Sequence, residues 1–284
     1  MRVARSRDLV AAGYPLSAVA RAARISRQAL YRTPTPRHSP QRRPPPDAVE
    51  QAIVEVAKEN QTDGYRMVTA FVRRRLGVAV NRKRVLRVMR ERKLIQRRRP
   101  LERRKRPGFF LVERPRQLWQ LDMTSVWVAE HGWTYLMAMI DCCTREIVAW
   151  QLELRCRADE AIALVERAAA AYRIEPGELV LGSDNGSAFT ARRFRATLAQ
   201  LGIRHRRGGY RDPESQAFIE SWFGKLKERE VWLNEYETLD DARRGIGGYV
   251  DRYHHRPHSS LNYRTPLEVR QTWEDQPKLQ KHAA

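Results

Sequence analysis

Three acidic residues lie where their carboxylates point to metal chemistry, and Asp122 is the first of them. It interrupts the apolar segment LWQLDMTSVWV. An unpaired carboxylate inside such a strand costs several kcal/mol of desolvation, so a cation must compensate it. A structural salt bridge and a metal ion are the two alternatives, and the metal ion is favoured only if further carboxylates converge on the same point.

Asp184 is the second candidate, because it directly follows the apolar segment ELVLGS. The ends of strands in α/β sheets are where functional groups gather, so this position suits a catalytic carboxylate. Asn185 and Gly186 follow it, and Asp-Asn-Gly is also good turn chemistry. A plain turn residue therefore remains the alternative interpretation of Asp184.

Glu220 is the third candidate, and it lies in a segment with a clear helical pattern, SQAFIESWFGKLKERE. Apolar residues at helical spacing predict a buried stripe, formed by Ile219, Trp222, Phe223 and Leu226. Glu220, Gly224 and Lys227 flank this stripe in one row. A glycine in mid-helix costs about 1 kcal/mol, and here it is expected to clear space between an acid and a base. An exposed helical pair of Glu220 and Lys227 is the alternative.

An α/β domain is expected to position these acids. Apolar runs predict strands, and amphipathic runs predict helices. The strands are expected at 118–128, 133–140, 146–154, 178–182 and 203–206, and the helices at 159–172, 191–201 and 213–229. The resulting order, βββαβαβα, is that of a layered α/β fold that opens with a meander.

The N-terminal third is predicted to be helical and basic. Residues 16–32 resemble a helix-turn-helix in which Ser26 caps the second helix and Arg27 and Gln28 meet DNA bases, although a purely structural helical pair is the alternative. Six prolines in 33–47 predict a stiff linker. A second helical block follows, in which Asn81 is expected to cap a helix.

Charge points to a polyanionic partner. The chain has 284 residues and a net charge of +21, and fourteen of the 25 residues from Arg82 to Arg106 are Lys or Arg. Such an unbalanced basic run favours contacts with phosphate over a merely solvated face. The longest apolar stretch is too short to cross a membrane, and no secretory signal is evident, so a cytosolic protein is expected. Three cysteines without CxxC spacing are expected to be reduced.

Several segments in order resemble the DDE transposases of bacterial insertion sequences, relatives of retroviral integrases. They are GYRMV, NRKRVLRVM, LWQLDMT, GWTYLMAMIDCCTREIVAW, SDNGSAFT, AFIESWFGKLKERE and YHHRPHSSLNYRTPLEV. The spacing also matches, since 35 residues separate Asp184 from Glu220 and a basic residue, Lys227, stands seven beyond Glu220. The product of the second reading frame of the insertion-sequence-three-like group is the nearest description.

The resemblance implies an RNase H-like core in which Asp122, Asp184 and Glu220 hold two Mg²⁺ ions, or Mn²⁺, roughly 3.5 to 4 Å apart. It further implies 3′-end cleavage and strand transfer, with Asn185 supporting the metal site and Lys227 holding a phosphate. Homo-oligomers on paired DNA ends and a partner segment from an upstream reading frame are also implied. Further DNA contacts are expected from the basic residues Arg66, Arg82, Lys83, Arg84 and Arg87.

The expected organisation has five parts. These are a short helix-turn-helix at 1–33, a linker at 34–47, a helical DNA-binding domain at 48–107, the catalytic core at 112–235 and a helical extension at 236–284. The family's usual Asp-Asn-Ala before the Glu is replaced by Ser215, Gln216 and Ala217, which puts the subgroup in doubt. Integrases carry a zinc domain at the N-terminus, but the first hundred residues contain one His and no Cys, so zinc is not expected.

Two other functions remain open. A DNA-binding regulator descended from a transposase would keep the helical blocks and lack turnover, but the three intact acids argue against it. An RNase H-like nuclease would cut branched or hybrid nucleic acid without joining strands. The two basic helical blocks favour directed binding to element ends, which such a nuclease does not need.

Overall fold

The computed structural model describes residues 2–31, 47–95, 112–208 and 216–282. The predicted linker up to residue 46, the basic run beyond residue 95 and the predicted helix start at 213 lie outside these residues. The chain divides after Asp47 into two compact units. No helix in the described part is both long and apolar enough to cross a membrane.

The first unit contains three short helices, α1 (Arg2–Ala11), α2 (Leu16–Ala22) and α3 (Arg27–Tyr31). Val19 and Leu30 are buried between them. The Ser26 hydroxyl accepts a hydrogen bond from the amide of Ala29 at 3.3 Å, which is the predicted cap. The guanidinium of Arg7 donates to the carbonyls of Ala29 and Leu30 and so holds the end of α3.

The second unit begins with a three-helix bundle, α4 (Ala48–Glu59), α5 (Tyr65–Leu76) and α6 (Arg82–Glu91). Each helix contributes buried aliphatic side chains, such as Ile53, Val68 and Val85, to one cluster. Gly77 ends α5 in the left-handed conformation, with φ +65°, which favours glycine. As predicted, the side chain of Asn81 caps α6 by accepting from the amide of Lys83 at 2.8 Å.

A mixed five-stranded sheet forms the centre of the second unit, with the order β3-β2-β1-β4-β5. The strands are β1 (Leu118–Val128), β2 (Gly132–Asp141), β3 (Ile147–Glu153), β4 (Val180–Ser183) and β5 (Arg204–Arg207). The first three strands form the expected antiparallel meander, and β4 and β5 add in parallel beside β1. The predicted α/β class is confirmed.

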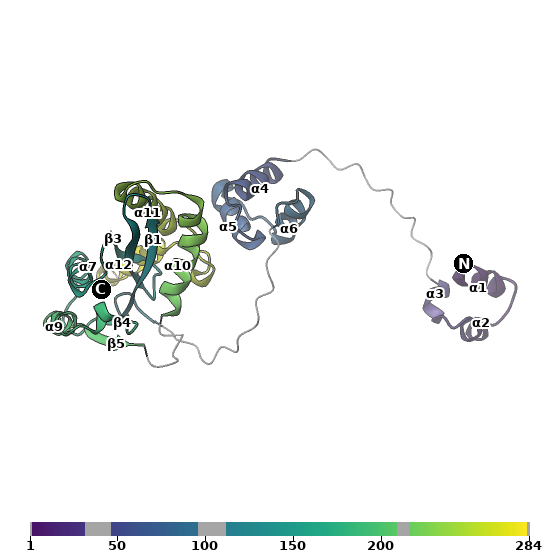
Figure 1. The fold of residues 1–284 in the computed structure, drawn as a ribbon. Helices are drawn as coiled ribbons and strands as arrows, with labels where there is room; N and C mark the ends of the chain where they lie inside the picture. The colour runs from purple at the N-terminus through teal and green to yellow at the C-terminus, as the bar shows by residue number, and fades with distance from the viewer. Residues whose placement is uncertain (1, 32–46, 96–111, 209–215, 283–284) are drawn as a thin grey trace. The chain divides into compact units, whose positions relative to one another are not determined.

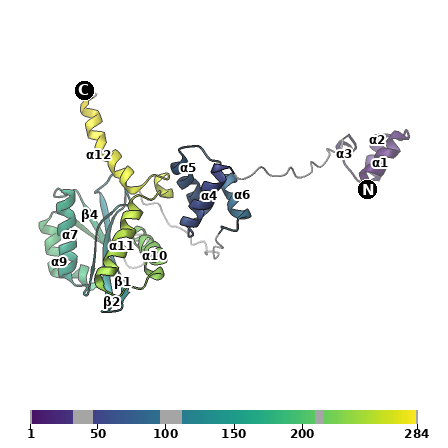
Figure 2. The same cartoon turned by 90° about the horizontal axis from the view of Figure 1, so that it is seen from above.

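Helices cover both faces of the sheet (Figures 1 and 2). One face packs on α7 (Ala158–Tyr172), α8 (Ser187–Thr190) and α9 (Arg192–Gln200), in a core around Trp119 and Phe194. The other face packs on α10 (Ala217–Arg229) and α11 (Leu239–His254). The short helix α8 was not predicted, because four residues are too few to show a helical period.

The C-terminal segment completes the core and is not a separate extension. It contains η1 (Val231–Leu233), α11, η2 (Ser259–Leu261) and α12 (Pro266–His282). The rings of Tyr249 and Tyr253 lie 6.3 and 6.2 Å from Trp222 of α10. The carbonyl of Tyr236 accepts from the amide of Ala129 at 2.9 Å. The predicted boundary at 235/236 therefore falls inside one packed layer.

Candidate active site

The three predicted acids come from three different elements. Asp122 lies in the middle of β1, Asp184 follows the last residue of β4, and Glu220 lies in the first turn of α10. Strands β1 and β4 are parallel neighbours, and Leu121 pairs with Ser183. Asp122 and Asp184 each follow one member of this pair, so the sheet brings the two aspartates side by side.

Gln120 fixes the position of α10 relative to β1. Its side chain is 1% exposed, and its Oε1 atom accepts hydrogen bonds from the amides of Phe218 and Ile219, both at 3.1 Å. These amides belong to the first turn of the helix, where backbone donors have no partner inside the helix. Gln120 stands two residues before Asp122 on the same face of the strand. The same contact therefore draws the helix that carries Glu220 toward Asp122.

The carboxylates influence one another electrostatically. Burial, together with the negative charges of Asp184 and Glu220, raises the pKa of Asp122 to about 6, although a hydrogen bond from the amide of Met123 opposes the shift. That bond measures 2.7 Å to Oδ1. Three acids that repel one another in this way form a local excess of negative charge, which is the electrostatic requirement of a cation site.

Asp184 has both a turn contact and a free face. Its Oδ1 atom accepts from the amide of Gly186 at 2.9 Å, so the alternative interpretation as a turn residue is also correct. The residue remains exposed and can still bind a ligand. Asn185 donates from Nδ2 to the carbonyl of Gly208 at 3.0 Å, which ties the loop after β4 to the end of β5. Asn185 thus supports the loop that carries Asp184.

Glu220 is exposed, and Lys227 is half-buried on the same helix. A Cβ atom added to Gly224 would meet nothing within 4 Å. The glycine therefore faces open space, and it does not clear a crowded slot between the acid and the base as expected. Because glycine has no side chain, the helix surface beside Glu220 stays open to solvent.

The donor set suits a hard divalent cation, since carboxylate oxygens are the ligands that Mg²⁺ and Mn²⁺ prefer. Among the described residues, however, no three His, Cys, Asp or Glu side chains are grouped closely enough to hold an ion as they stand. Asp184 and Glu220 are exposed and have room to turn. The three acids therefore fit a metal site that closes when side chains rotate, not one that is already formed.

Two other polar residues have structural roles. Asp141 accepts hydrogen bonds from the amides of Arg116, Cys143 and Thr144 and from the indole of Trp119, so it is a turn and pairing residue. His254 ends α11, and its Nε2 atom accepts from the amide of Ile147 at 3.1 Å. Neither residue joins the three acids.

The residues predicted to contact DNA differ in their exposure and in whether they form ion pairs within the protein. Arg27 and Gln28 are exposed at the start of α3, and Arg66, Arg82 and Lys83 are exposed in the helical bundle. Arg84 and Arg87 instead lie 3.8 and 2.9 Å from the carboxylate of Glu50. These two are partly neutralised within the bundle, which the local excess of basic residues in the sequence could not show.

Two buried polar residues, Gln120 and Asp63, were not predicted from the sequence. Gln120 was overlooked as one more residue of an apolar strand, although a buried amide two positions before a candidate acid is a usable signal. Asp63 is 5% exposed and pairs with both Arg229 and Arg256. These partners are more than 160 residues away in the chain, so no local pattern reveals them.

Comparisons with known proteins agree with this fold. Two models described as Integrase core domain match residues 112–213 and 201–266, and an HTH-like domain model matches residues 45–104. The helix-turn-helix similarity thus falls on α4–α6, whereas the sequence pattern suggested it for 16–32. The simian T-cell lymphotropic virus intasome structure matches with a TM-score of 0.50 and 18% identity, over 75% of this chain and 73% of the other, which supports the fold.

The similar curated sequences are transposases. The transposase InsD for insertion element IS2-9 of Escherichia coli K12 is 29% identical over 94% of this chain and 92% of its own length. The transposase for insertion sequence element IS904 of Lactococcus lactis is 30% identical over 56% of this chain and 63% of its own length. The chain therefore belongs to the integrase-core family, alongside the insertion-sequence transposases that it resembles along almost its whole length.

Proposed function

We propose that this protein is a DDE-type transposase that cuts DNA at the ends of an insertion sequence and joins the freed 3′-ends to target DNA. The observation that carries the proposal is the placement of three acids on neighbouring elements: Asp122 on β1, Asp184 at the end of the adjacent parallel strand β4, and Glu220 in the first turn of α10. The transposases among its relatives support the same conclusion.

The three acids are the proposed ligands of Mg²⁺, for which Mn²⁺ can substitute. When bound, the divalent ions polarise phosphate oxygens and promote deprotonation of the attacking hydroxyl. The protein contributes positioning. Gln120 holds α10 against β1, and Asn185 holds the loop of Asp184. Lys227, on the helix of Glu220, is proposed to hold a phosphate of the DNA beside the acids.

Two successive reactions follow the same chemistry. In cleavage, a water oxygen bonds to the phosphorus at the element end, the bond from phosphorus to the 3′-oxygen breaks, and that oxygen leaves as a 3′-hydroxyl. In strand transfer, this hydroxyl attacks a phosphorus of the target strand, whose own 3′-oxygen leaves. Each step forms one phosphorus–oxygen bond and breaks one. Cleavage consumes one water and one phosphodiester, strand transfer exchanges one phosphodiester for another, and neither needs a covalent protein intermediate.

DNA is the proposed partner, bound by the helical regions through Arg27, Gln28, Arg66, Arg82 and Lys83, with Arg84 and Arg87 available if Glu50 releases them.

Pairing of two element ends requires at least two copies of the chain, so a homo-oligomer on DNA is proposed. A partner from an upstream reading frame would add a further DNA-binding segment. The site of action would then be the bacterial nucleoid.

The test compares three proteins on DNA that carries the ends of the protein's own element. The parent chain, Asp184→Asn and Asp240→Asn are incubated with Mg²⁺, and 3′-cleavage and strand-transfer products are resolved on denaturing gels. Asp240 is a matched control, because it is an exposed acid on α11, a helix that carries none of the proposed ligands.

Products from the parent and Asp240→Asn, but not from Asp184→Asn and not in the presence of a chelator, are expected. Equal cleavage by Asp184→Asn would remove the basis of the proposed site. DNA binding without products from any protein, even with the upstream-frame segment added, would favour the regulator. Cleavage without joining would favour the nuclease.

A further inference from the structure

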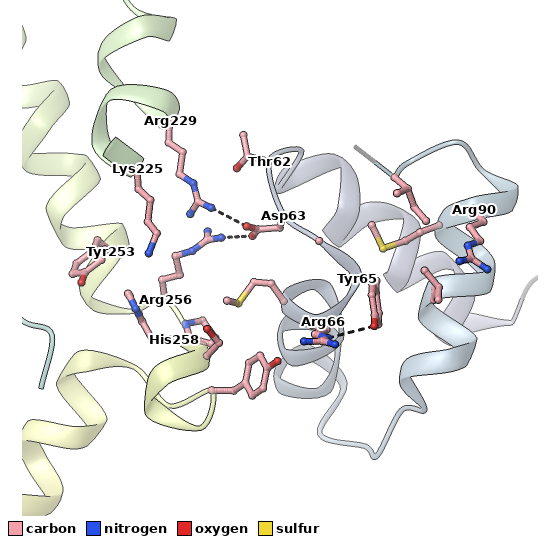
Figure 3. A pocket seen from close by; sticks show the side chains of 18 residues that line it. Thr62, Asp63, Tyr65, Arg66, Arg90, Lys225, Arg229, Tyr253, Arg256 and His258 are labelled. Carbon is pink, nitrogen blue, oxygen red and sulfur yellow. Dashed lines mark hydrogen bonds and ion pairs between the residues drawn. The ribbon is translucent and has the colours of Figure 1, made fainter. Parts of the chain in front are cut away.

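A cavity lies between the helical bundle and the core, away from the three acids. Its volume is about 890 Å³, within the range of roughly 300 to 1,000 Å³ typical of ligand sites. Figure 3 shows its walls, formed by the turn between α4 and α5, by α6, by the second half of α10 and by the segment after α11. That last segment belongs to the YHHRPHSSLNYRTPLEV motif, which the catalytic site does not use.

The cavity is strongly cationic. Its described lining contains five basic side chains, namely Arg66, Arg90, Lys225, Arg229 and Arg256. Asp63 is the only acid in that lining, and it is engaged with two of these cations. Its carboxylate lies 3.0 Å from Arg229 and also contacts Arg256 (Figure 3). One buried acid cannot neutralise five cations, so the lining keeps a positive excess.

Several polar side chains around the cavity have atoms without partners among the described residues. The Nε atom of Arg229 and the Nε2 atom of His258 are buried and have no hydrogen-bond partner among the described residues. Lys225 remains accessible and forms no salt bridge within the described part of the chain. Buried polar groups in proteins are normally satisfied, so the orphaned guanidinium N–H of Arg229 beside a cationic cavity indicates a missing acceptor.

Titration of the lining residues agrees with this charge. Partial burial and the neighbouring cations Arg229, Arg256 and Arg145 lower the pKa of Lys225. Burial lowers the pKa of His258 to about 3, with further contributions from Lys225, Arg256, Arg145 and Arg229. Burial is the larger cause of both shifts, and the smaller contributions from the neighbouring cations agree with the positive excess of the lining.

The positive surface continues beyond the cavity. A second, smaller cavity shares Arg66 and Tyr263 with the first and is also lined by Arg82 of α6. The guanidinium of Arg82 lies 5.4 Å from the ring centre of Tyr263. The two cavities therefore form a continuous row of basic side chains from the core to the HTH-like domain. Such a row matches the successive phosphates of a DNA strand. This continuity favours a polymer over a small free anion.

We infer that this cavity binds a phosphate of the DNA backbone and so sets the position of the DNA bound by the HTH-like domain relative to the core. The inference rests on the proposed function, because it assumes that DNA is the ligand. Lys225 is the residue that probes it best, because it lines the cavity from α10, the helix that also carries Glu220.

The first measurement is binding of a fluorescein-labelled DNA duplex by fluorescence anisotropy over a series of salt concentrations. Lys225→Gln should bind roughly tenfold more weakly than the parent, and the slope of log affinity against log salt should shrink by about 0.9. Lys225→Arg should retain most of the affinity. Lys58→Gln, which removes an exposed cation of α4, should match the parent.

Thermal unfolding separates a binding role from a structural one. Lys225 stands among cations, so Lys225→Gln should unfold at the same temperature as the parent or higher. A lower unfolding temperature together with weaker DNA binding would assign Lys225 a structural role and overturn the inference. Equal affinity and equal salt slope for the parent and Lys225→Gln would also overturn it.

Pyrophosphate distinguishes the source of the phosphate. If pyrophosphate raises the unfolding temperature of the parent but not of Lys225→Gln, while DNA binding is equal, the site takes a free phosphate compound and the assignment to DNA is wrong. The outcomes also distinguish failure of this inference from failure of the proposed function. If DNA binding depends on Lys225 but the parent never cuts DNA, the phosphate site is supported and the transposase function is not. If the parent cuts DNA and Lys225→Gln binds equally well, the transposase function is supported and the phosphate site is not.

Discussion

The Asp122 carboxyl is held in an environment that disfavours its charge. It lies in a central strand, and burial together with Asp184 and Glu220 raises its pKa from 3.8 to about 6. A folded protein does not keep such a group for stability, because the ionised form costs free energy. Bound divalent cations would remove the repulsion, so the cost is consistent with a site that is completed by metal.

This cost predicts a pH-dependent gain in stability for Asp122→Asn. The pKa is higher in the folded state, so the parent loses stability as pH rises from about 4 to 6 and stays at the lower level above 6. In chelator at neutral pH, Asp122→Asn should therefore be more stable by roughly 1 to 3 kcal/mol.

Urea unfolding across this pH range measures the difference between the two proteins. Asp240→Asn, an exposed acid, should show no comparable gain. Mg²⁺ should stabilise the parent and leave Asp122→Asn nearly unchanged. A parent that is more stable than Asp122→Asn in chelator at neutral pH would contradict the interpretation of Asp122 as a strained ligand.

Single residues were predictable where chemistry conflicts with the local pattern. A carboxylate inside an apolar strand is conspicuous, so Asp122 could be recognised from the sequence. Asp63 gave no local signal, and Gln120 gave only its position two residues before Asp122, because the partners of both side chains lie about 100 or more residues away. The pairing of Arg84 and Arg87 with Glu50 was likewise hidden, since it arises between helices.

At the scale of elements, the placement of α10 decides whether Glu220 meets the aspartates. The first turn of this helix depends on one acceptor from β1, the Gln120 side chain. Strand and helix could each be read from their own periodicity, but the contact between them required the fold. The packing of α11 against α10 was hidden for the same reason, whereas α8 is too short to show a helical period.

Gln120→Met should separate activity from folding. Methionine is close in volume, but it leaves the amides of Phe218 and Ile219 without their acceptor, which costs about 1 to 3 kcal/mol. We expect a folded protein whose Mg²⁺-dependent cleavage falls at least tenfold. Gln200→Met, at an exposed site on α9, should retain both stability and cleavage.

The measurements are urea unfolding and gel-based cleavage at several Mg²⁺ concentrations. If α10 has moved, higher Mg²⁺ should restore part of the activity of Gln120→Met. Full cleavage at low Mg²⁺ would mean that Gln120 does not position the helix of Glu220.

Asp63 connects two elements that are distant in sequence. Its side chain is buried and bridges Arg229 at the end of α10 and Arg256 beyond α11. Asp63→Asn leaves these two cations facing each other, so we expect a loss of about 3 kcal/mol in the free energy of unfolding. Asp240→Asn, whose ion pair is exposed, should lose less than 1 kcal/mol.

Urea unfolding followed by circular dichroism tests this prediction. Because α4–α6 form their own buried cluster, loss of the Asp63 bridge should loosen the attachment of the bundle and leave its helices intact. A double change, Asp63→Asn with Arg229→Gln, should lose less than the sum of the two single changes. Additive losses would mean that the two side chains do not interact energetically.

At the scale of the whole molecule, the buried hydrophobic clusters are distributed unevenly between the two units. The three large buried clusters all lie within residues 48–284, whereas the described residues of the first unit bury only Ser6, Val19, Ala20 and Leu30. Domains below about 40 residues rarely fold stably on their own. The stability of the chain is therefore expected to come from the second unit, and the first unit is expected to add mainly to DNA binding.

This division predicts the behaviour of a fragment that begins at Ala48. Because the chain divides after Asp47 and residues 48–284 contain complete cores, the fragment should unfold at nearly the same temperature as the full chain. Its DNA affinity should fall, since the fragment lacks Arg27, Gln28 and the other exposed polar residues of the first unit.

Calorimetry and fluorescence anisotropy measure these two properties on the same samples. Arg27→Gln in the full chain should reproduce part of the affinity loss without any change in unfolding temperature, because Arg27 is exposed. A fragment that unfolds many degrees lower would show that residues 1–47 stabilise the core. Unchanged affinity for both proteins would remove the first unit from DNA recognition and leave that role to the HTH-like domain at 45–104.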